Sequence, residues 1–362
     1  MQYSVVRYSE VLNSSYRFDS EYWVADVINY NKQFKTLSDL NIKVVSGPFG
    51  SSLKSEAYCN SGVPFVRISD LNNFFISKDN LIHISEEDHK RLSSSRLKYN
   101  DLILSKVGNT IGVVSILTPE IGYECNISEN NLGIRLWNND LKINPYFLLS
   151  YLNCKIGQKQ ILRLISGNAQ PKLNVADIKN LKLPIILDLF QLRIEELVKN
   201  SYKISNSSKS LYNEAENLLL EELNLKDWKP KHQLSYVKSY SDTQKAERFD
   251  AEYFQPQYDE IIEKVKNIQN DDLGNIVKWS KGIEVGSEQY IDEGFDFVRI
   301  SDFNTKGISE ASKKISKELF LELKDKFSPK KGDILFTKDG TIGLTYLVNQ
   351  DQNSIISGAF LK

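Results

Sequence analysis

Side chains that can bind a nucleic acid lie beside or near glycines at several places in the chain. Lysine, asparagine and hydroxyl side chains supply donors and acceptors that contact phosphates and distinguish base edges. A neighbouring glycine lets the backbone approach a phosphate closely. An equally good interpretation is that Gly108 and Gly112 only shape a hairpin turn. The candidate contacts are Ser51, Ser52, Lys54, Asn72, Asn73, Lys106, Asn109 and Thr110 in the first half of the chain, and Lys281, Lys338 and Thr341 in the second.

Residues for catalysis or metal binding are scarce. The chain has no Gly-x-x-x-x-Gly-Lys-Ser/Thr loop for nucleotide phosphates. Its histidines are isolated, and His83 and His89 lack the cysteine or carboxylate pattern of a metal site. The stretch 144–147 is similar to the Asn-Pro-Pro-Tyr element of adenine methyltransferases, but the second proline and a nearby cofactor loop are missing. We expect Asn144 to cap a helix with Pro145 at its first position, and we predict a non-catalytic protein without cofactor or metal.

Composition bounds the class of protein and its partners. The 362 residues include 46 basic and 47 acidic side chains, for a formal net charge of −1. Because phosphate neutralisation supplies much of the affinity for DNA, a neutral chain should bind DNA weakly by itself, and a partner could supply positive surface. No apolar run approaches the ~20 residues of a membrane span, the N-terminus lacks a secretory pattern, and the cysteines are scattered. The simplest interpretation is a cytoplasmic protein without membrane contact.

A long internal repeat organises the chain. Both copies contain a block that ends in a glycine followed by Thr-Ile-Gly. A period of this length indicates duplicated domains, not a solenoid of short units. Three blocks recur in the same order with offsets of 231 or 232 residues: Arg17–Trp23 as Arg248–Phe254, Val63–Asp70 as Phe295–Asp302, and Asp101–Lys106 as Asp333–Lys338.

Each copy has the pattern of a mixed α+β domain. Short apolar runs bounded by Gly, Asn and Asp, such as 65–68 and 102–104, predict β-strands. The polar stretch from Glu86 to Leu97 is helical in character. We therefore expect two α+β domains with several loops.

A different element separates the two copies. A series of positions that starts at Phe190 alternates steps of four and three residues, with serines at two of them. This a/d spacing predicts a coiled-coil helix over residues 187–225, after a boundary at Pro184. Such a helix needs a partner helix, for which a second copy of the chain is one candidate; the alternative is a long helix on its own domain's surface. The expected apolar interface consists of Phe190, Ile194, Leu197, Ile204, Leu211 and Leu218.

Several stretches, taken in order, resemble the specificity subunit of type I restriction–modification enzymes. The resemblance covers the whole chain and is carried most specifically by 46–53, 62–68 and 101–112, with the turn 166–173 before the spacer helix. It implies two tandem target-recognition domains that read the two halves of a split double-stranded DNA site. It also implies that the chain directs methyltransferase subunits, and restriction subunits through the complex, to that site, and that the methyl donor and ATP bind those partners.

The resemblance gives expected boundaries. Residues 1–183 would form the first target-recognition domain, 184–226 the spacer helix, and 227–362 a second, incomplete domain. Because domains that read different half-sites should differ in their recognition residues, the repeated Arg67 and Asp70, with Arg299 and Asp302, are better candidates for structural ion pairs or a docking role than for readout.

Two other functions stay open. The chain could be a coiled-coil interaction module without sequence readout of its own. It could also be a self-contained DNA methyltransferase, which the missing cofactor loop argues against. Copurification with a methyltransferase partner, or methyl transfer by the chain alone, would separate these alternatives.

Overall fold

The computed structural model describes residues 8–9, 34–137, 143–167 and 171–362. The chain divides into two compact units, Met1–Asn217 and Leu218–Lys362. The first copy of the Arg-Phe-Asp block, residues 17–23, lies outside the described residues.

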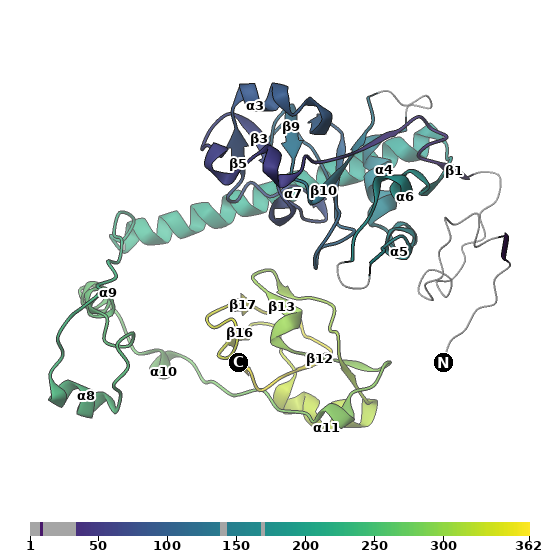
Figure 1. Ribbon diagram of the computed structural model, residues 1–362. Coiled ribbons are helices and arrows are strands. Elements are labelled where there is room, and N and C mark those ends of the chain that lie inside the picture. Colours follow the sequence, from purple (N-terminus) through teal and green to yellow (C-terminus); the bar gives the residue numbers. More distant parts are fainter. Residues whose placement is uncertain (1–7, 10–33, 138–142, 168–170) are drawn as a thin grey trace. The chain divides into compact units, whose positions relative to one another are not determined.

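The first unit contains two main sheets (Figure 1). Most neighbouring strands are antiparallel, but β3 pairs with β9, and β4 with β8, in parallel. One sheet has the strand order β2 (Lys43–Ser46), β10 (Asn131–Arg135), β7 (Leu102–Ser105), β8 (Val114–Ile116), β4 (Phe74–Phe75). The other has the order β5 (Ile82–Ile84), β3 (Val63–Val66), β9 (Glu124–Ile127), β6 (Arg96–Lys98), and a separate pair joins β1 (Phe34–Thr36) to β11 (Lys182–Pro184).

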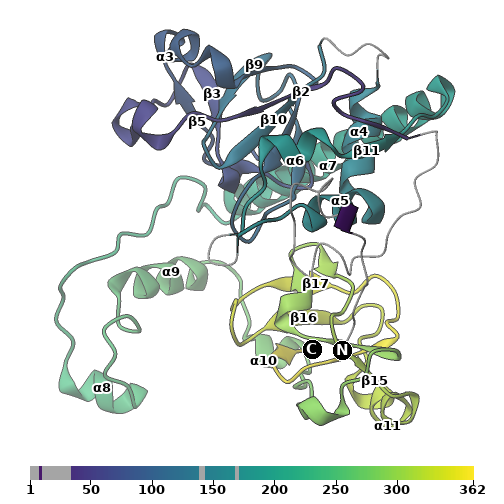
Figure 2. The same cartoon turned by 45° about the vertical axis from the view of Figure 1, so that its right-hand side comes forward.

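Helices pack on the five-stranded sheet, and strand β7 lies between two hydrophobic cores. Leu102 and Leu104 belong to a core shared with the helices, whereas Ile103 belongs to a core shared with the other sheet. Because successive side chains of a strand point to opposite faces, the continuous apolar run of β7 fits a strand buried on both sides. The helices are α4 (Pro145–Asn153), α5 (Lys155–Arg163), α6 (Val175–Lys179) and α7 (Asp188–Glu222) (Figures 1 and 2).

Asn144 fixes the start of α4 and joins it to α7. Its Oδ1 accepts from the backbone N–H groups of Tyr146 (2.9 Å) and Phe147 (3.2 Å). Its Nδ2 donates to Glu195 of α7 at 2.5 Å, and Pro145 occupies the first helical position. The predicted cap is therefore confirmed, and the similarity to a methyltransferase element has a structural explanation.

The long helix is confirmed, but its apolar positions divide between two faces. Ile194 and Val198 pack against the core of the first unit, and the Tyr202 ring lies 4.3 Å from the Phe75 ring. A second face carries residues spaced seven apart that are 55–70% exposed, and we call it the α7 stripe. The stripe consists of Phe190, Leu197, Ile204, Leu211 and Leu218.

The expected helix from Glu86 to Leu97 is wrong in its second half. Helix α3 covers Glu86–Arg91, a 3-10 turn follows at Ser93–Ser95, and Leu97 lies in strand β6. Leu97 is fully buried, and β6 pairs with β9. Pairing and burial therefore override the polar helical pattern.

The second unit is also a mixture of helices and strands. Its sheets have the orders β15 (Lys314–Ile315), β12 (Phe295–Val298), β18 (Ser354–Ile356), and β17 (Thr345–Leu347), β16 (Ile334–Thr337), β19 (Phe360–Leu361), with a small pair of β13 (Phe303–Asn304) and β14 (Gly307–Ile308). Its helices are α8 (Tyr240–Ala246), α9 (Pro256–Lys266), α10 (Leu273–Ile276) and α11 (Lys317–Phe327).

The sequence repeat corresponds to repeated strand pairing. Strand β3 pairs antiparallel with β5 and parallel with β9, and β12 pairs in the same way with β15 and β18. Strand β16 pairs with β17 and β19 as β7 pairs with β8 and β10. The α+β class and the duplicated fold are confirmed. Position 329 of the second copy, which corresponds to Leu97, is a proline, and a proline cannot donate within a sheet.

One sheet face differs between the units. Leu102 and Ile116, which are paired across β7 and β8, are fully buried. Their counterparts Ile334 and Leu347, paired across β16 and β17, are 50% and 62% exposed. The apolar face of β7 and β8 is therefore buried in the first unit, whereas the corresponding face of β16 and β17 is exposed to water in the second.

This difference predicts unequal effects of truncation. Leu102→Ala should destabilise the first unit by about 2–5 kcal/mol, the usual cost of removing a leucine from a packed core. Ile334→Ala should cost less than about 1 kcal/mol, because much of that side chain is already solvated. Hydrogen exchange of the β7 and β16 amides, followed by mass spectrometry, would measure each unit separately. Equal losses at the two positions would contradict the exposed face.

Candidate nucleic-acid interface

Strands of the first unit end together at one edge. The carbonyl of Val66, at the end of β3, accepts from the Ser128 N–H (3.0 Å), and the Gly47 N–H donates to the Asn131 carbonyl (3.2 Å). The Lys106 N–H, just after β7, donates to the Asn130 carbonyl (2.9 Å). We call the connecting segments at this edge the loop cluster: residues 46–54, 67–69, 106–112, 128–130, 166–167 and 171–173.

Contacts with residues 128–129 hold the loop 46–54 in place. A Cβ atom on Gly47 would lie 1.9 Å from the Ser128 carbonyl oxygen, so only glycine fits there. The Gly50 N–H donates to Glu129 Oε2 at 2.6 Å. Between these two anchors the Phe49 side chain is 82% exposed. Of the predicted contacts, Ser51 and Ser52 lie in the 3-10 helix Gly50–Ser52, and Lys54 is exposed.

The loop 106–112 forms the hairpin turn that its glycines suggested. Gly108 and Gly112 have φ angles of +78° and +92°, which glycine adopts without strain. Lys106 Nζ donates to the Glu129 carbonyl at 2.9 Å, so this ammonium is engaged inside the protein. Asn109 and Thr110 are exposed at the tip. Their contact with DNA, like that of Lys106, stays a prediction.

One further segment lies beside the hairpin turn, and another lies beside β8. The Leu173 N–H donates to the Lys106 carbonyl at 3.0 Å, so residues 172–173 lie against the hairpin; residues 168–170 are outside the described part. Asn72 and Asn73 are both exposed, and the Asn72 carbonyl accepts from Ser115 Oγ at 2.5 Å. The sequence candidates of the first half are thus exposed or lie within the loop cluster, with the Asn72–Asn73 pair next to β8.

The second unit repeats this edge. The Ser357 N–H donates to the Val298 carbonyl (2.9 Å), and Gly282 lies against the Ser357 carbonyl, where a Cβ would be 2.1 Å from the oxygen. Lys281 is exposed, whereas Lys338 pairs with the neighbouring Asp339 at 2.7 Å. Exposed Thr341 accepts at its carbonyl from the Thr337 hydroxyl at 2.5 Å.

Repeated arginine–aspartate pairs support both edges. Arg67 donates to Asp70 at 3.0 and 3.2 Å, and Asp70 is only 2% exposed. Arg299 lies 3.7 Å from Asp302, which also accepts from Ser312 Oγ at 2.8 Å. The predicted structural ion pairs are confirmed. They fix the short 3-10 turns that follow β3 and β12.

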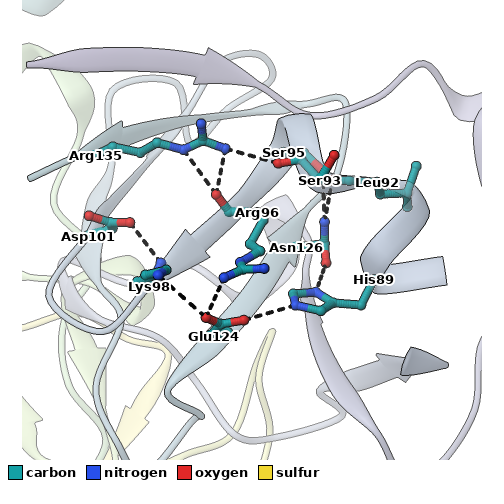
Figure 3. Close-up of polar contacts among 10 residues, drawn as sticks. All are labelled: His89, Leu92, Ser93, Ser95, Arg96, Lys98, Asp101, Glu124, Asn126 and Arg135. Atoms are coloured by element: carbon teal, nitrogen blue, oxygen red, sulfur yellow. Dashed lines mark hydrogen bonds and ion pairs between the residues drawn. The ribbon is translucent and has the colours of Figure 1, made fainter. Parts of the chain in front are cut away.

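A polar network lies at the opposite end of β9 (Figure 3). Glu124 accepts from Arg96 at 2.8 Å and from His89 Nε2 at 3.1 Å, and Lys98 Nζ lies 3.9 Å away. The other ring nitrogen of His89 contacts the Asn126 side chain. The amide nitrogen of Asn126 donates in turn to the Leu92 carbonyl at the C-terminal end of α3. The network ties α3 to β6 and β9, and its charged groups face one another. We assign it a structural role.

Sequence reasoning missed Phe49 and Glu129. Phe49 stands between glycines in the loop 46–54, which the sequence offers for DNA contact through its serine and lysine side chains, and an aromatic in that setting was the available signal. Glu129 gave none, because its contact with Gly50 joins residues 79 positions apart. Among the described residues, no group of three or more His, Cys, Asp or Glu side chains is arranged to hold a metal, and no helix is long and apolar enough to cross a membrane.

Comparisons with known proteins identify the class. Residues 31–217 match the family model of the type I restriction modification DNA specificity domain, which is more than half of the chain. The chain therefore belongs to this family. Over 124 residues it is 26% identical to the type I restriction enzyme EcoBI specificity subunit of Escherichia coli. That match covers 34% of this chain and only 25% of the relative, so the chain matches about a quarter of the relative's length.

Solved structures show weaker likeness. The S subunit of the type I restriction–modification system from M. genitalium is 13% identical, with a TM-score of 0.44, over 92% of this chain and 74% of that one. The HsdS subunit from Thermoanaerobacter tengcongensis is 15% identical, with a TM-score of 0.33, over 93% of this chain and 76% of that one. At these TM-scores the likeness adds nothing to the family assignment.

Asp101 gives a pH-dependent test of the first unit. Its carboxylate is 1% exposed and accepts from the backbone N–H groups of Lys98 (2.7 Å) and Leu136 (2.8 Å). Burial raises the pKa of Asp101 to about 6, against the effect of these bonds. Between pH 4 and 6 the unfolded chain therefore loses this proton before the folded chain does, and stability falls as the pH rises.

We predict that Asp101→Asn destabilises the unit less at pH 7 than at pH 4, by about 2 kcal/mol. The asparagine does not titrate, so the variant does not show the loss of folding stability that the wild type shows as the pH rises over this range. Urea unfolding at both pH values measures the difference. Asp39→Asn is the control, because hydrogen bonds from Thr36 lower the pKa of Asp39 and its effect should have the opposite sign. A pH-independent difference for Asp101→Asn would contradict the prediction.

Proposed function

We propose that the chain is a DNA-recognition subunit of a type I restriction–modification complex and that the loop cluster of each unit contacts one half of a split DNA site. The observation that carries this proposal is the repeated edge: two units with the same strand pairing present corresponding loops with different side chains. Family membership supports the same function. Selection of bound sequences by gel shift, with the chain and its methyltransferase partner reconstituted, tests the proposal; a complex without sequence preference would argue for an interaction module instead.

The division of labour follows from charge. Lys106 and Lys338 have internal partners, and Arg67 pairs with Asp70. Lys54, Lys172 and Lys281 are exposed without an ion pair among the described residues. Few cations are thus available for phosphates, and we infer that methyltransferase subunits supply much of the affinity. In this proposal the chain itself is not catalytic, and methyl transfer by the purified chain alone would count against it.

The exposed residues of the first loop cluster should separate affinity from specificity. Lys54→Ala should weaken binding of all sequences by the reconstituted complex and lower the salt slope by about 1, because one phosphate contact is lost. Asn109→Ala should cost about 1–3 kcal/mol at one base position only. Fluorescence anisotropy at several salt concentrations measures both. Lys35→Ala, an exposed lysine on β1 outside the loop cluster, is the control, and equal effects of all three variants would contradict these roles.

We also propose that two copies of the chain pair through the α7 stripe. Its five apolar residues recur every seven positions and are mostly in water. Because exposed apolar surface is unfavourable at about 25 cal/mol per Å², pairing of two such stripes would be stabilising. A two-fold dimer would present two first units to DNA and would favour a palindromic, split site. Ser201 and Ser208, within the same heptad pattern, should leave the dimer concentration-dependent.

Analytical ultracentrifugation tests the dimer. Leu197→Asp and Leu211→Asp should shift the chain to monomer at tens of micromolar, because each places a charge within the paired stripes. Leu192→Asp is the matched control, since Leu192 is 56% exposed but lies off the stripe. A monomeric wild type, or a dimer that survives both substitutions, would remove this proposal.

A further inference from the structure

A cavity of about 280 Å³ opens within the loop cluster of the first unit. Phe49 forms part of its exposed wall, whereas Phe65, only 3% exposed, lines its interior. The rings of Tyr58 and Phe65 are 5.7 Å apart and tilted by 33°. The cavity thus combines a solvated aromatic at the mouth with aromatic surface inside, which suits a flat aromatic guest.

One polar side chain in the lining has unused hydrogen-bonding capacity. Ser128 is among the lining residues, but its hydroxyl oxygen is buried from solvent and is not open to a guest. Glu129 uses Oε2 to accept from Gly50, and its Oε1 has no partner in the described part of the chain. A guest that donates to Glu129 Oε1 would add a charge-assisted hydrogen bond to the carboxylate. A carboxylate oxygen accepts from the exocyclic amino group of a nucleobase.

We propose that this cavity holds a nucleobase with an exocyclic amino group that is turned out of the DNA helix. The inference rests on the proposed function, because the cavity lies within the loops assigned to DNA. Phe49 is placed to enter the space that the base leaves, as apolar side chains do when they unstack DNA. Glu129 then contacts the base, and the Gly47 and Gly50 anchors keep the Phe49 loop rigid.

The second unit provides an internal contrast. Its corresponding loop, 282–287, contains no aromatic residue. Ile283 of this loop packs partly buried against the core of the second unit. We therefore assign the extruded base to the half-site that the first unit reads.

Fluorescent base analogues test the proposal in the reconstituted complex. Each adenine, cytosine and guanine of the first half-site is replaced in turn by 2-aminopurine, pyrrolocytosine or 6-methylisoxanthopterin. At saturating protein, the wild type should raise the fluorescence at one position in a way that Phe49→Ala abolishes, returning it to the level of free DNA. Glu129→Gln should lower the same signal. A base that the methyltransferase extrudes for its own reaction is distinguished because its signal does not depend on Phe49.

Tyr123→Ala is the matched control. Tyr123 is 72% exposed and lies at the opposite end of β9 from the loop cluster, so its truncation should leave the signal unchanged. Phe49 is itself a surface residue, so Phe49→Ala should fold normally. If no position gives a Phe49-dependent signal, or if Tyr123→Ala removes it equally, the proposal is wrong.

Two arms separate the sources of failure. Anisotropy of the same complexes reports sequence-specific binding: without it the proposed function fails, whereas binding without a Phe49-dependent signal overturns only the extruded base. In the second arm, 2-aminopurine riboside monophosphate is titrated onto the complex without DNA. No saturable binding at micromolar concentration is expected, and tight binding there would replace the DNA base by a free nucleotide as the ligand.

Discussion

The burial of β7 on both faces is the constraint on which the first unit depends. Leu102 and Leu104 face the helices and Ile103 faces the second sheet, so one strand joins two cores. Its two ends are then fixed. Just before the strand, Asp101 accepts hydrogen bonds from two backbone N–H groups. Just after it, Lys106 is hydrogen-bonded to the backbone of residues 129–130. Because β7 cannot shift without uncovering both cores, the loops that extend from it have a defined position.

A site assembled in this way uses much of its own charge. Lys106 fixes Glu129, Glu129 fixes the Phe49 loop, and Arg67 fixes the turn after β3 through Asp70. These bonds order the loops before any ligand arrives, which lowers the entropic cost of binding. They also leave fewer cations for phosphates. Rigid loops with little free positive charge suit a protein that contributes selectivity while partners contribute affinity.

In the first unit, helices α4 and α5 pack against one face of the five-stranded sheet. With them, the sheet face around Leu102 is dry; in the second unit the same face, around Ile334, is half in water. The edge that carries the loops is nevertheless built in both units from the same pairings. In the second unit this edge includes β12, β15 and β18, and α11 packs beside them.

Local and periodic features were readable from the sequence alone. The repeat at 231–232 residues, the long helix and the cap at Asn144 depend on side chains within a few positions of one another or on a strict period. The strand expected at 102–104 is confirmed as β7, whereas the one expected at 65–68 ends earlier, at Val66, because Ile68 begins a 3-10 turn. The family motifs then gave the class of protein. For the candidate site, sequence identified the loops but not their internal bonds.

Only the tertiary structure decided which side of each element faces the protein. It turned Ile194 inward and left Leu197 in water, although both fit the heptad pattern, because the first unit covers one face of α7. It ended α3 at Arg91, because Leu97 is needed in a core. It brought Glu129 under Gly50 across 79 residues. Such contacts depend on the register of strands paired far apart along the chain, and no local pattern of residues encodes that register.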